Sequence, residues 1–182
     1  MTPSAEVQQS FLVALSEFHR EDRYTDLDRW TLSQPGAFAA YLDELAAEAL
    51  PDTPRRAGIV PQTMLWWVDG ARFLGRLGIR HWLTDALRQV GGHIGYDVVP
   101  SARRRGHATA MLRAALPIAA GMGIDPALVT CDIDNIASRK VIEGNGGRLW
   151  QAGDGKLRFW LATSRPTRPA DDDRPSSVSA IL

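Results

Sequence analysis

The stretch GGHIGYDVVPSARRRGHATAML, residues 91–112, decides the fold of this chain. Its first half reads as a strand that stops at Pro100, and its second half begins an apolar helix face. Between them lies a turn with three arginines and Gly106. A strand-to-helix turn that contains glycine exposes backbone N–H groups at the positive end of a helix, and this geometry suits a phosphate or a pyrophosphate.

The residues of this turn are compatible with two interpretations, an anion-binding site and a solvated surface loop. Gly106 lets the backbone approach closely, and the small side chain of Ala108 keeps the helix near the anion. Three consecutive arginines add charge at any working pH, although three arginines on a loop also fit a solvated surface. The turn is neither a Walker loop nor a dinucleotide-binding G-x-G-x-x-G. The neighbouring elements must therefore decide between a ligand site and a surface loop.

The rest of the chain supplies these elements. Apolar residues at helical spacing predict two amphipathic N-terminal helices, and Asp69-Gly70 between two apolar runs predicts a hairpin. After the turn we expect a helix that Pro117 kinks or shortens, a strand, a helix capped by Asn135 and two more strands. We expect one mixed α/β domain over residues 1–163, with N-terminal helices in 1–50, a core in 61–163, and a disordered tail in 164–182.

Composition narrows the classes of function. The chain has 182 residues, 45% of them hydrophobic, and its 21 basic and 21 acidic residues cancel. This balance disfavours nucleic acid or an anionic membrane as a partner. Cys131 is the single cysteine, which excludes an internal disulfide and predicts a reducing compartment. Since the N-terminus has no basic segment followed by an apolar run, we expect a cytoplasmic protein.

The segment Arg103-x-x-Gly106-x-Ala108 resembles the [Q/R]-x-x-G-x-[G/A] signature of the GNAT superfamily of N-acetyltransferases. The likeness spans roughly residues 61–161 and includes 91–96 before the signature and 129–147 after it. It implies a GNAT-like fold with two extra N-terminal helices, acetyl-CoA as cosubstrate, and no metal ion. In that superfamily the strand before the signature splays from its neighbour, and its backbone pairs with the pantetheine arm.

The resemblance also assigns cofactor contacts. It gives the pantetheine to the backbones of Val98 and Val99, and the pantetheine or phosphate end to Asn135 and Ser138. It gives the pyrophosphate to a run of seven residues: Arg103, Arg104, Arg105, Gly106, His107, Ala108 and Thr109. Asn135 is also a helix cap, and Ser138 fits a surface hydroxyl equally well.

The catalytic residues are less clear from the pattern. Many superfamily members have a tyrosine seven residues after the asparagine that corresponds to Asn135, and this tyrosine protonates the departing thiolate. In this chain the position is Ile142. Cys131, Ser138, Tyr96 or water remain as proton donors. An alkyl amine, with a pKa of about 10.4, must lose a proton before it attacks. We predict that His93 is the base. A purely structural role for His93 is one alternative, and Asp97 or His81 as the base is another.

We therefore expect an acetyl-CoA-dependent N-acetyltransferase that acts on a primary amine of a small molecule. Aminoglycoside-like antibiotics, amino acids and polyamines all fit this description. Two alternatives remain: acetylation of a protein N-terminus or lysine, and a non-catalytic module that senses acyl-CoA. Acidic residues between 17 and 26 would attract a cationic amine or form a solvated face. A homodimer, with Val178, Ile181 and Leu182 packed on a partner subunit, is also open.

Overall fold

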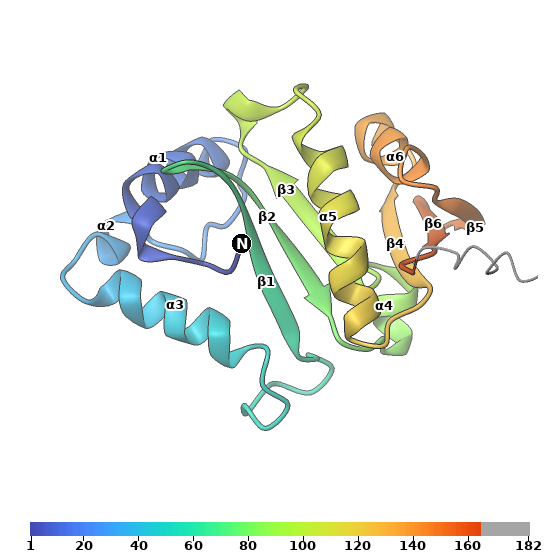
Figure 1. The fold of residues 1–182 in the computed structure, drawn as a ribbon, viewed down its shortest axis with the longest axis horizontal. Coiled ribbons are helices and arrows are strands. Elements are labelled where there is room, and N and C mark those ends of the chain that lie inside the picture. The colour runs from blue at the N-terminus through green and yellow to red at the C-terminus, as the bar shows by residue number, and fades with distance from the viewer. Residues whose placement is uncertain (165–182) are drawn as a thin grey trace, which may run out of the picture.

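Two small antiparallel sheets stand side by side in the computed structural model, which describes residues 1–164 (Figure 1). The first sheet has the order β1-β2-β3, and the second has the order β4-β6-β5. The strands are β1 (Gln62–Asp69), β2 (Arg72–Arg80), β3 (Ile94–Val98), β4 (Ala127–Asp132), β5 (Arg148–Gly153) and β6 (Lys156–Leu161). The mixed α/β fold predicted from the sequence is confirmed, with its sheet divided into these two halves.

The helices surround the two sheets unevenly. Figure 1 shows α1, α2 and α3 together beside β1, α5 in front of the first sheet, and α6 next to the second. They are α1 (Gln8–His19), α2 (Arg29–Leu32), α3 (Ala37–Ala47), α4 (Asp85–Gln89), α5 (His107–Gly121) and α6 (Ile136–Glu143), with two short 3-10 turns, η1 (Ala5–Val7) and η2 (Pro100–Ala102). The N-terminal helices are thus present, and the short α2 lies between the two that were predicted.

The hairpin of β1 and β2 alternates its side chains between the two helical layers. Asp69 pairs with Arg72 around Gly70, whose φ of +54° suits a tight turn. Trp66 is buried and stacks on Phe11 of α1 with ring centroids 4.9 Å apart. Trp67 points to the other face, where its indole reaches the start of α5. One face of the first sheet therefore meets α1 and α3, and the other meets α5.

Two local expectations have different outcomes. Asn135 caps α6 by accepting a hydrogen bond from the Ser138 amide at 2.9 Å, as predicted. Pro117 does not shorten α5, which runs on to Gly121. Within residues 1–164, no helix is long and apolar enough to cross a membrane. Of the tail that we expected to be disordered, only Ser164 is described, and residues 165–182 lie outside the described residues.

Candidate active site

A cleft opens where β3 and β4 separate. The two strands touch only near the start of β3, through a bridge between Gly92 and Val129 and a hydrogen bond of 2.7 Å from the His93 amide to the Leu128 carbonyl. Gly92 has a φ of +62°, and a Cβ there would lie 2.4 Å from the Leu128 carbonyl oxygen. Only glycine allows this close contact. Beyond it lies a cleft of about 570 Å³, which β3 lines on one side and α6 on the other.

The cleft combines residues from four parts of the chain. They come from the segment after α1, from β3, from the turn before α5, and from α6. The lining residues are Glu21, Arg23, Tyr96, Asp97, Val98, Ala102, Arg103, Arg104, Gly106, His107, Ala108, Thr109, Asn135, Ala137, Ser138 and Val141. The structure thus brings together most of the residues that the sequence assigned to a cofactor. Val99, Arg105 and His93 are the three predicted site residues that do not line this cleft.

The backbone of β3 offers Val98, but not Val99, to the cleft. The Val99 amide donates to the Leu74 carbonyl at 2.9 Å, and its carbonyl accepts from the Ala102 amide at 2.8 Å. Both groups are therefore used within the protein, which argues against the predicted contact of Val99 with pantetheine. Because successive residues of a strand point their polar groups to opposite sides, Val98 faces the gap between the sheets.

The turn before α5 presents free backbone amides. Arg104 and Gly106 both have positive φ, +64° and +82°, and Gly106 is the helix N-cap without any side-chain cap. The first helical bond runs from the Ala110 amide to the Gly106 carbonyl at 3.0 Å. The amides of His107, Ala108 and Thr109 precede it and have no partner within the helix. They point out of the positive end of a helix of 15 residues, as an anion site requires.

The three arginines of this turn have different roles. Arg103 donates to both carboxylate oxygens of Glu21, at 2.8 and 2.7 Å, and its Nε donates to the Val98 carbonyl at 3.0 Å. Its guanidinium is thus committed to the protein rather than to a phosphate. Arg104 lines the cleft, and Arg105 is exposed outside it. The charge for a pyrophosphate therefore comes mainly from Arg104 and the backbone amides.

The N-terminal segment holds the turn in place. Glu17 of α1 accepts from the Ser101 amide at 2.8 Å and from its hydroxyl at 2.9 Å. Together with the Glu21 pair, this contact fixes η2 and the following turn against α1. The sequence had suggested acidic residues here as attractants for an amine or as a solvated face. Two of them instead anchor the turn, at separations of more than 80 residues that local patterns do not reveal.

His107 is oriented by a tryptophan. The indole Nε1 of Trp67 donates to its Nδ1 at 3.3 Å. A neutral imidazole that accepts at Nδ1 carries its proton on Nε2, so His107 can donate a hydrogen bond with that nitrogen. Its place at the start of α5, in the lining of the cleft, agrees with the predicted role in the cofactor site.

Tyr96 reaches across the cleft to α6. Its hydroxyl lies 2.7 Å from the Ser138 hydroxyl, and burial raises the pKa of Tyr96 to about 12. Ile142, at the position where many superfamily members carry tyrosine, is fully buried in the core. Cys131 is also buried, and burial raises the pKa of its thiol. Of the proton donors considered from the sequence, Tyr96 and Ser138 are the two that line the cleft.

His93 lies at the junction of the two sheets. Its Nδ1 accepts from the Leu128 amide at 2.9 Å, and burial lowers its pKa to about 4, with help from Arg88 and Arg80. These contacts favour the structural alternative over the predicted role as base. His81 is likewise outside the cleft, 2.8 Å from the Thr63 hydroxyl, with its pKa lowered by burial.

Among residues 1–164, Asp97 and Glu21 are the two carboxylates that line the cleft, and Asp97 is the one on β3. It pairs with Arg23 at 2.7 Å and accepts from the Tyr24 hydroxyl at 3.2 Å. Burial raises its pKa, against the opposing effects of Arg23, Tyr24 and Arg103. Since neighbouring residues of a strand point to opposite faces, Tyr96 and Asp97 approach the gap between the sheets from its two sides.

A family model described as an acetyltransferase (GNAT) domain matches residues 12–148. The chain belongs to the GNAT acetyltransferases. The match runs from within α1 to the first residue of β5, and it includes the whole of the turn before α5. None of the curated proteins compared with the chain matches it.

Solved structures share this GNAT fold. One is Mycobacterium smegmatis RimJ in complex with CoA-disulfide, with 22% identity, a TM-score of 0.60, and coverage of 88% of this chain and 79% of that one. Another is the microcin C7 self-immunity acetyltransferase MccE with acetyl-CoA and AMP, with 10% identity, a TM-score of 0.59 and coverage of 89% and 90%. A third is yncA from Salmonella typhimurium with acetyl-CoA, with 13% identity, a TM-score of 0.54 and coverage of 91% and 92%.

Acetyl-CoA is the cosubstrate of GNAT enzymes, and the cleft fits it. The uncapped amides at the start of α5 suit the pyrophosphate, and the amide of Val98 faces the gap where pantetheine would lie, while the Val98 carbonyl accepts from Arg103. Within residues 1–164, no three His, Cys, Asp or Glu side chains lie together as a metal site would require.

Proposed function

We propose that this GNAT protein transfers the acetyl group of acetyl-CoA to a primary amine of a small molecule. When bound, acetyl-CoA supplies an activated acyl group. The amides of His107, Ala108 and Thr109, together with Arg104, hold its pyrophosphate. The amide of Val98 pairs with the pantetheine arm, and Asn135 and Ser138 border it from α6.

The observation that carries the proposal is the placement of Tyr96 and Asp97 on consecutive positions of β3. Asp97 accepts a proton from the amine: its ion pair with Arg23 favours the ionised form, and burial makes that form a stronger base. Tyr96 on β3 stays protonated, and its hydroxyl, which contacts Ser138 of α6, donates its proton to the leaving sulfur. The missing tyrosine at position 142 is thus replaced from the opposite wall of the cleft.

One feature favours a small acceptor over a protein. The segment after α1 contributes Glu21 and Arg23 to the cleft and is fixed to the turn by Glu21 and Glu17, so it covers one approach to Asp97. A peptide acceptor needs an open groove at this point. The second hypothesis, a non-catalytic sensor of acyl-CoA, would require only the cofactor half of the cleft.

A thiol-release assay tests the proposal. The protein is incubated with acetyl-CoA and a panel of small amines, peptides with free N-termini and lysine peptides. Release of CoA that depends on a small amine supports the proposal, and mass spectrometry of the product confirms the acetylated nitrogen. Turnover with peptides alone would favour the protein acceptor, and CoA binding without any turnover would favour the sensor.

A further inference from the structure

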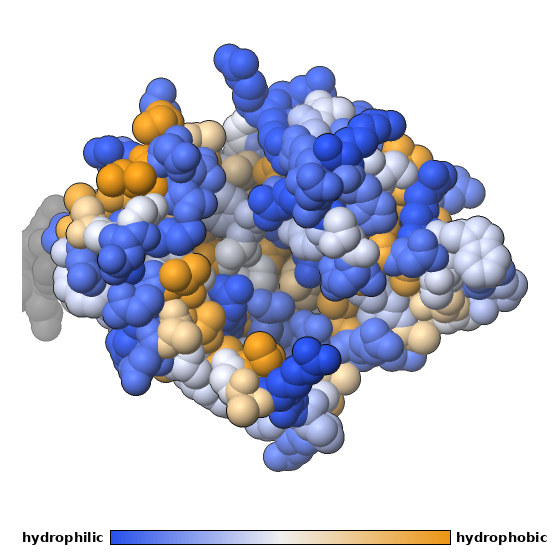
Figure 2. All heavy atoms as spheres, turned by 180° about the vertical axis from the view of Figure 1, so that it is seen from behind, coloured by the Kyte–Doolittle hydropathy of each residue, from blue (hydrophilic) through white to orange (hydrophobic). Residues whose placement is uncertain are grey.

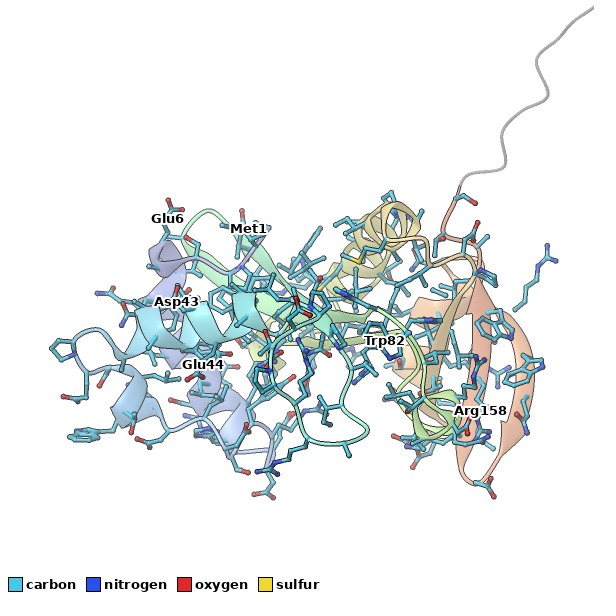
Figure 3. All side chains as sticks on the ribbon, turned by 90° about the horizontal axis from the view of Figure 1, so that it is seen from below. Met1, Glu6, Asp43, Glu44, Trp82 and Arg158 are labelled. Atoms are coloured by element: carbon cyan, nitrogen blue, oxygen red, sulfur yellow. The ribbon has the colours of Figure 1, made fainter. Side chains whose placement is uncertain are left out.

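A second cavity, of about 450 Å³, lies on the face of the first sheet opposite α5. Its walls are the segment 53–60, which leads into β1, and Leu87 of α4. Both walls project from the same side of the sheet (Figure 3), and the surface seen from behind the view of Figure 1 is hollowed near its centre (Figure 2). Gln62 and Arg80, cross-strand partners on β1 and β2, contribute to its lining.

The charge of this cavity is mostly positive. Arg55, Arg56 and Arg80 line it, against the single carboxylate of Glu48. Arg55 donates to carbonyls at the C-terminal end of α3 and beyond, such as those of Glu48 at 2.7 Å and Thr53 at 2.7 Å, so it mainly holds the wall. Arg80 lies deeper, at the end of β2.

Arg80 has carbonyl partners but no carboxylate partner among residues 1–164. Its Nη1 donates to the carbonyls of Gly91 and Gly92 at 3.2 and 3.1 Å. Burial lowers its pKa, which means that the surroundings oppose its charge. A partly buried guanidinium that faces a cavity without a counter-ion is suited to an anionic ligand.

The same face of the sheet connects Arg80 with Asp97. Gly78 pairs with Gly95 in the register of β2 and β3, and the side chain of Gln62 lies over Gly78. A Cβ on Gly95 would be 3.7 Å from Nη1 of Arg80, which places the guanidinium over β3 at this point. Asp97 lies two residues further along the same face, about 7 Å away along the strand.

We propose that this cavity binds an anionic group of the acceptor, so that the acceptor class is a primary amine that also carries a carboxylate or a phosphate. The anion pairs with Arg80, the connecting chain runs along the sheet face past Gly95, and the amine reaches Asp97. This inference rests on the proposed function, because it names the substrate class of the same reaction.

The test uses pairs of amines that differ only in the anion. We would compare kcat/KM for γ-aminobutyrate with its amide, and for phosphoethanolamine with ethanolamine, which separates a carboxylate from a phosphate preference. We expect the wild-type protein to prefer one anionic member by about 10- to 100-fold. Arg80→Gln, which keeps an amide donor for the glycine carbonyls, should lose that preference and leave the neutral amines within about threefold. Arg72→Gln, at the other end of β2, should change neither.

A binding measurement separates this inference from the proposed function. Calorimetry measures how the preferred anionic amine binds to the CoA-saturated protein. If that binding is lost in Arg80→Gln while no amine is acetylated, the anion site stands and the proposed function has failed. Equal wild-type turnover of charged and neutral amines would overturn the inference and leave acetyl transfer intact. An equal loss of kcat/KM for the anionic and the neutral member of each pair in Arg80→Gln would also overturn the inference. If Arg80→Gln does not fold, Arg56→Gln replaces it, with an expected loss of about threefold for the anionic members only.

Discussion

The hydroxyl of Tyr96 on β3 lies 2.7 Å from the hydroxyl of Ser138 on α6, across the cleft that these two elements line. This contact brings the phenol of Tyr96 next to α6, the helix in which Ile142 stands at the usual tyrosine position. Ser138 thereby has a clear role, since it orients Tyr96 from the first turn of α6.

Replacing Tyr96 with Phe tests this role. The substitution removes the hydroxyl and keeps the ring, so CoA affinity should change by less than about threefold while kcat falls by about 10- to 100-fold. Ser138→Ala keeps the phenol and only loosens it, and its kcat should therefore fall less. Steady-state kinetics with CoA calorimetry measure both. A Tyr96→Phe protein with normal kcat would assign proton donation to water.

Asp97→Asn tests the base. The variant keeps the shape of the side chain but cannot accept a proton, so we expect kcat/KM to fall by about 100- to 10,000-fold. The pH profile gives a second readout. Because burial raises the pKa of Asp97, the wild-type rate should fall as the pH drops through that raised pKa, and the variant should lose this limb. A variant with the same acid limb as the wild type would show that another group accepts the proton.

His93 should matter for stability rather than for turnover. The fold holds the pKa of His93 at about 4, below the ordinary value of 6.5, because burial and the nearby Arg88 and Arg80 disfavour its protonated form. Below pH 6.5 the unfolded chain therefore binds a proton that the native state refuses. Stability is full above that pH and is lost as the pH falls towards 4, by about 1–2 kcal/mol after allowance for partial exposure.

Urea unfolding at pH 7 and at pH 5 measures this effect. In His93→Gln the loss between the two pH values should shrink, and kcat at neutral pH should stay within about threefold of the wild type. Loss of most turnover in a folded His93→Gln protein would instead restore His93 as the base.

The fold followed from local patterns, because each of them depends on residues close in sequence. Asp69-Gly70 is a turn through its own backbone preferences, Asn135 caps the helix that follows it, and Gly106 opens α5. The strand predicted before Pro100 is also present, as β3 (Ile94–Val98). Such signals need no knowledge of the tertiary structure.

The roles of individual side chains did not follow, because they depend on contacts between distant segments. Arg103 belongs to a signature that suggests an anion site, but its guanidinium donates to the carboxylate of Glu21, 82 residues earlier in the chain. His93 has the intrinsic pKa of a base, but the close approach of β4 at Gly92 buries it. The carboxylate of Asp97 gains its environment from Arg23 and Tyr24, and nothing in the sequence near Asp97 indicates that neighbourhood.

Calorimetric titration of CoA into wild-type protein and a Gly106→Glu variant tests the central claim most directly. The added carboxylate would lie beside the amides that hold the pyrophosphate, so affinity should fall by at least about 100-fold. Gly146→Glu is the matched control, since Gly146 has nearly the same φ, +86° against +82°, and the same open surroundings outside the cleft. We predict that CoA binds the wild type and Gly146→Glu alike and Gly106→Glu hardly at all. Equal CoA affinity in both folded variants would contradict the assignment of this cleft.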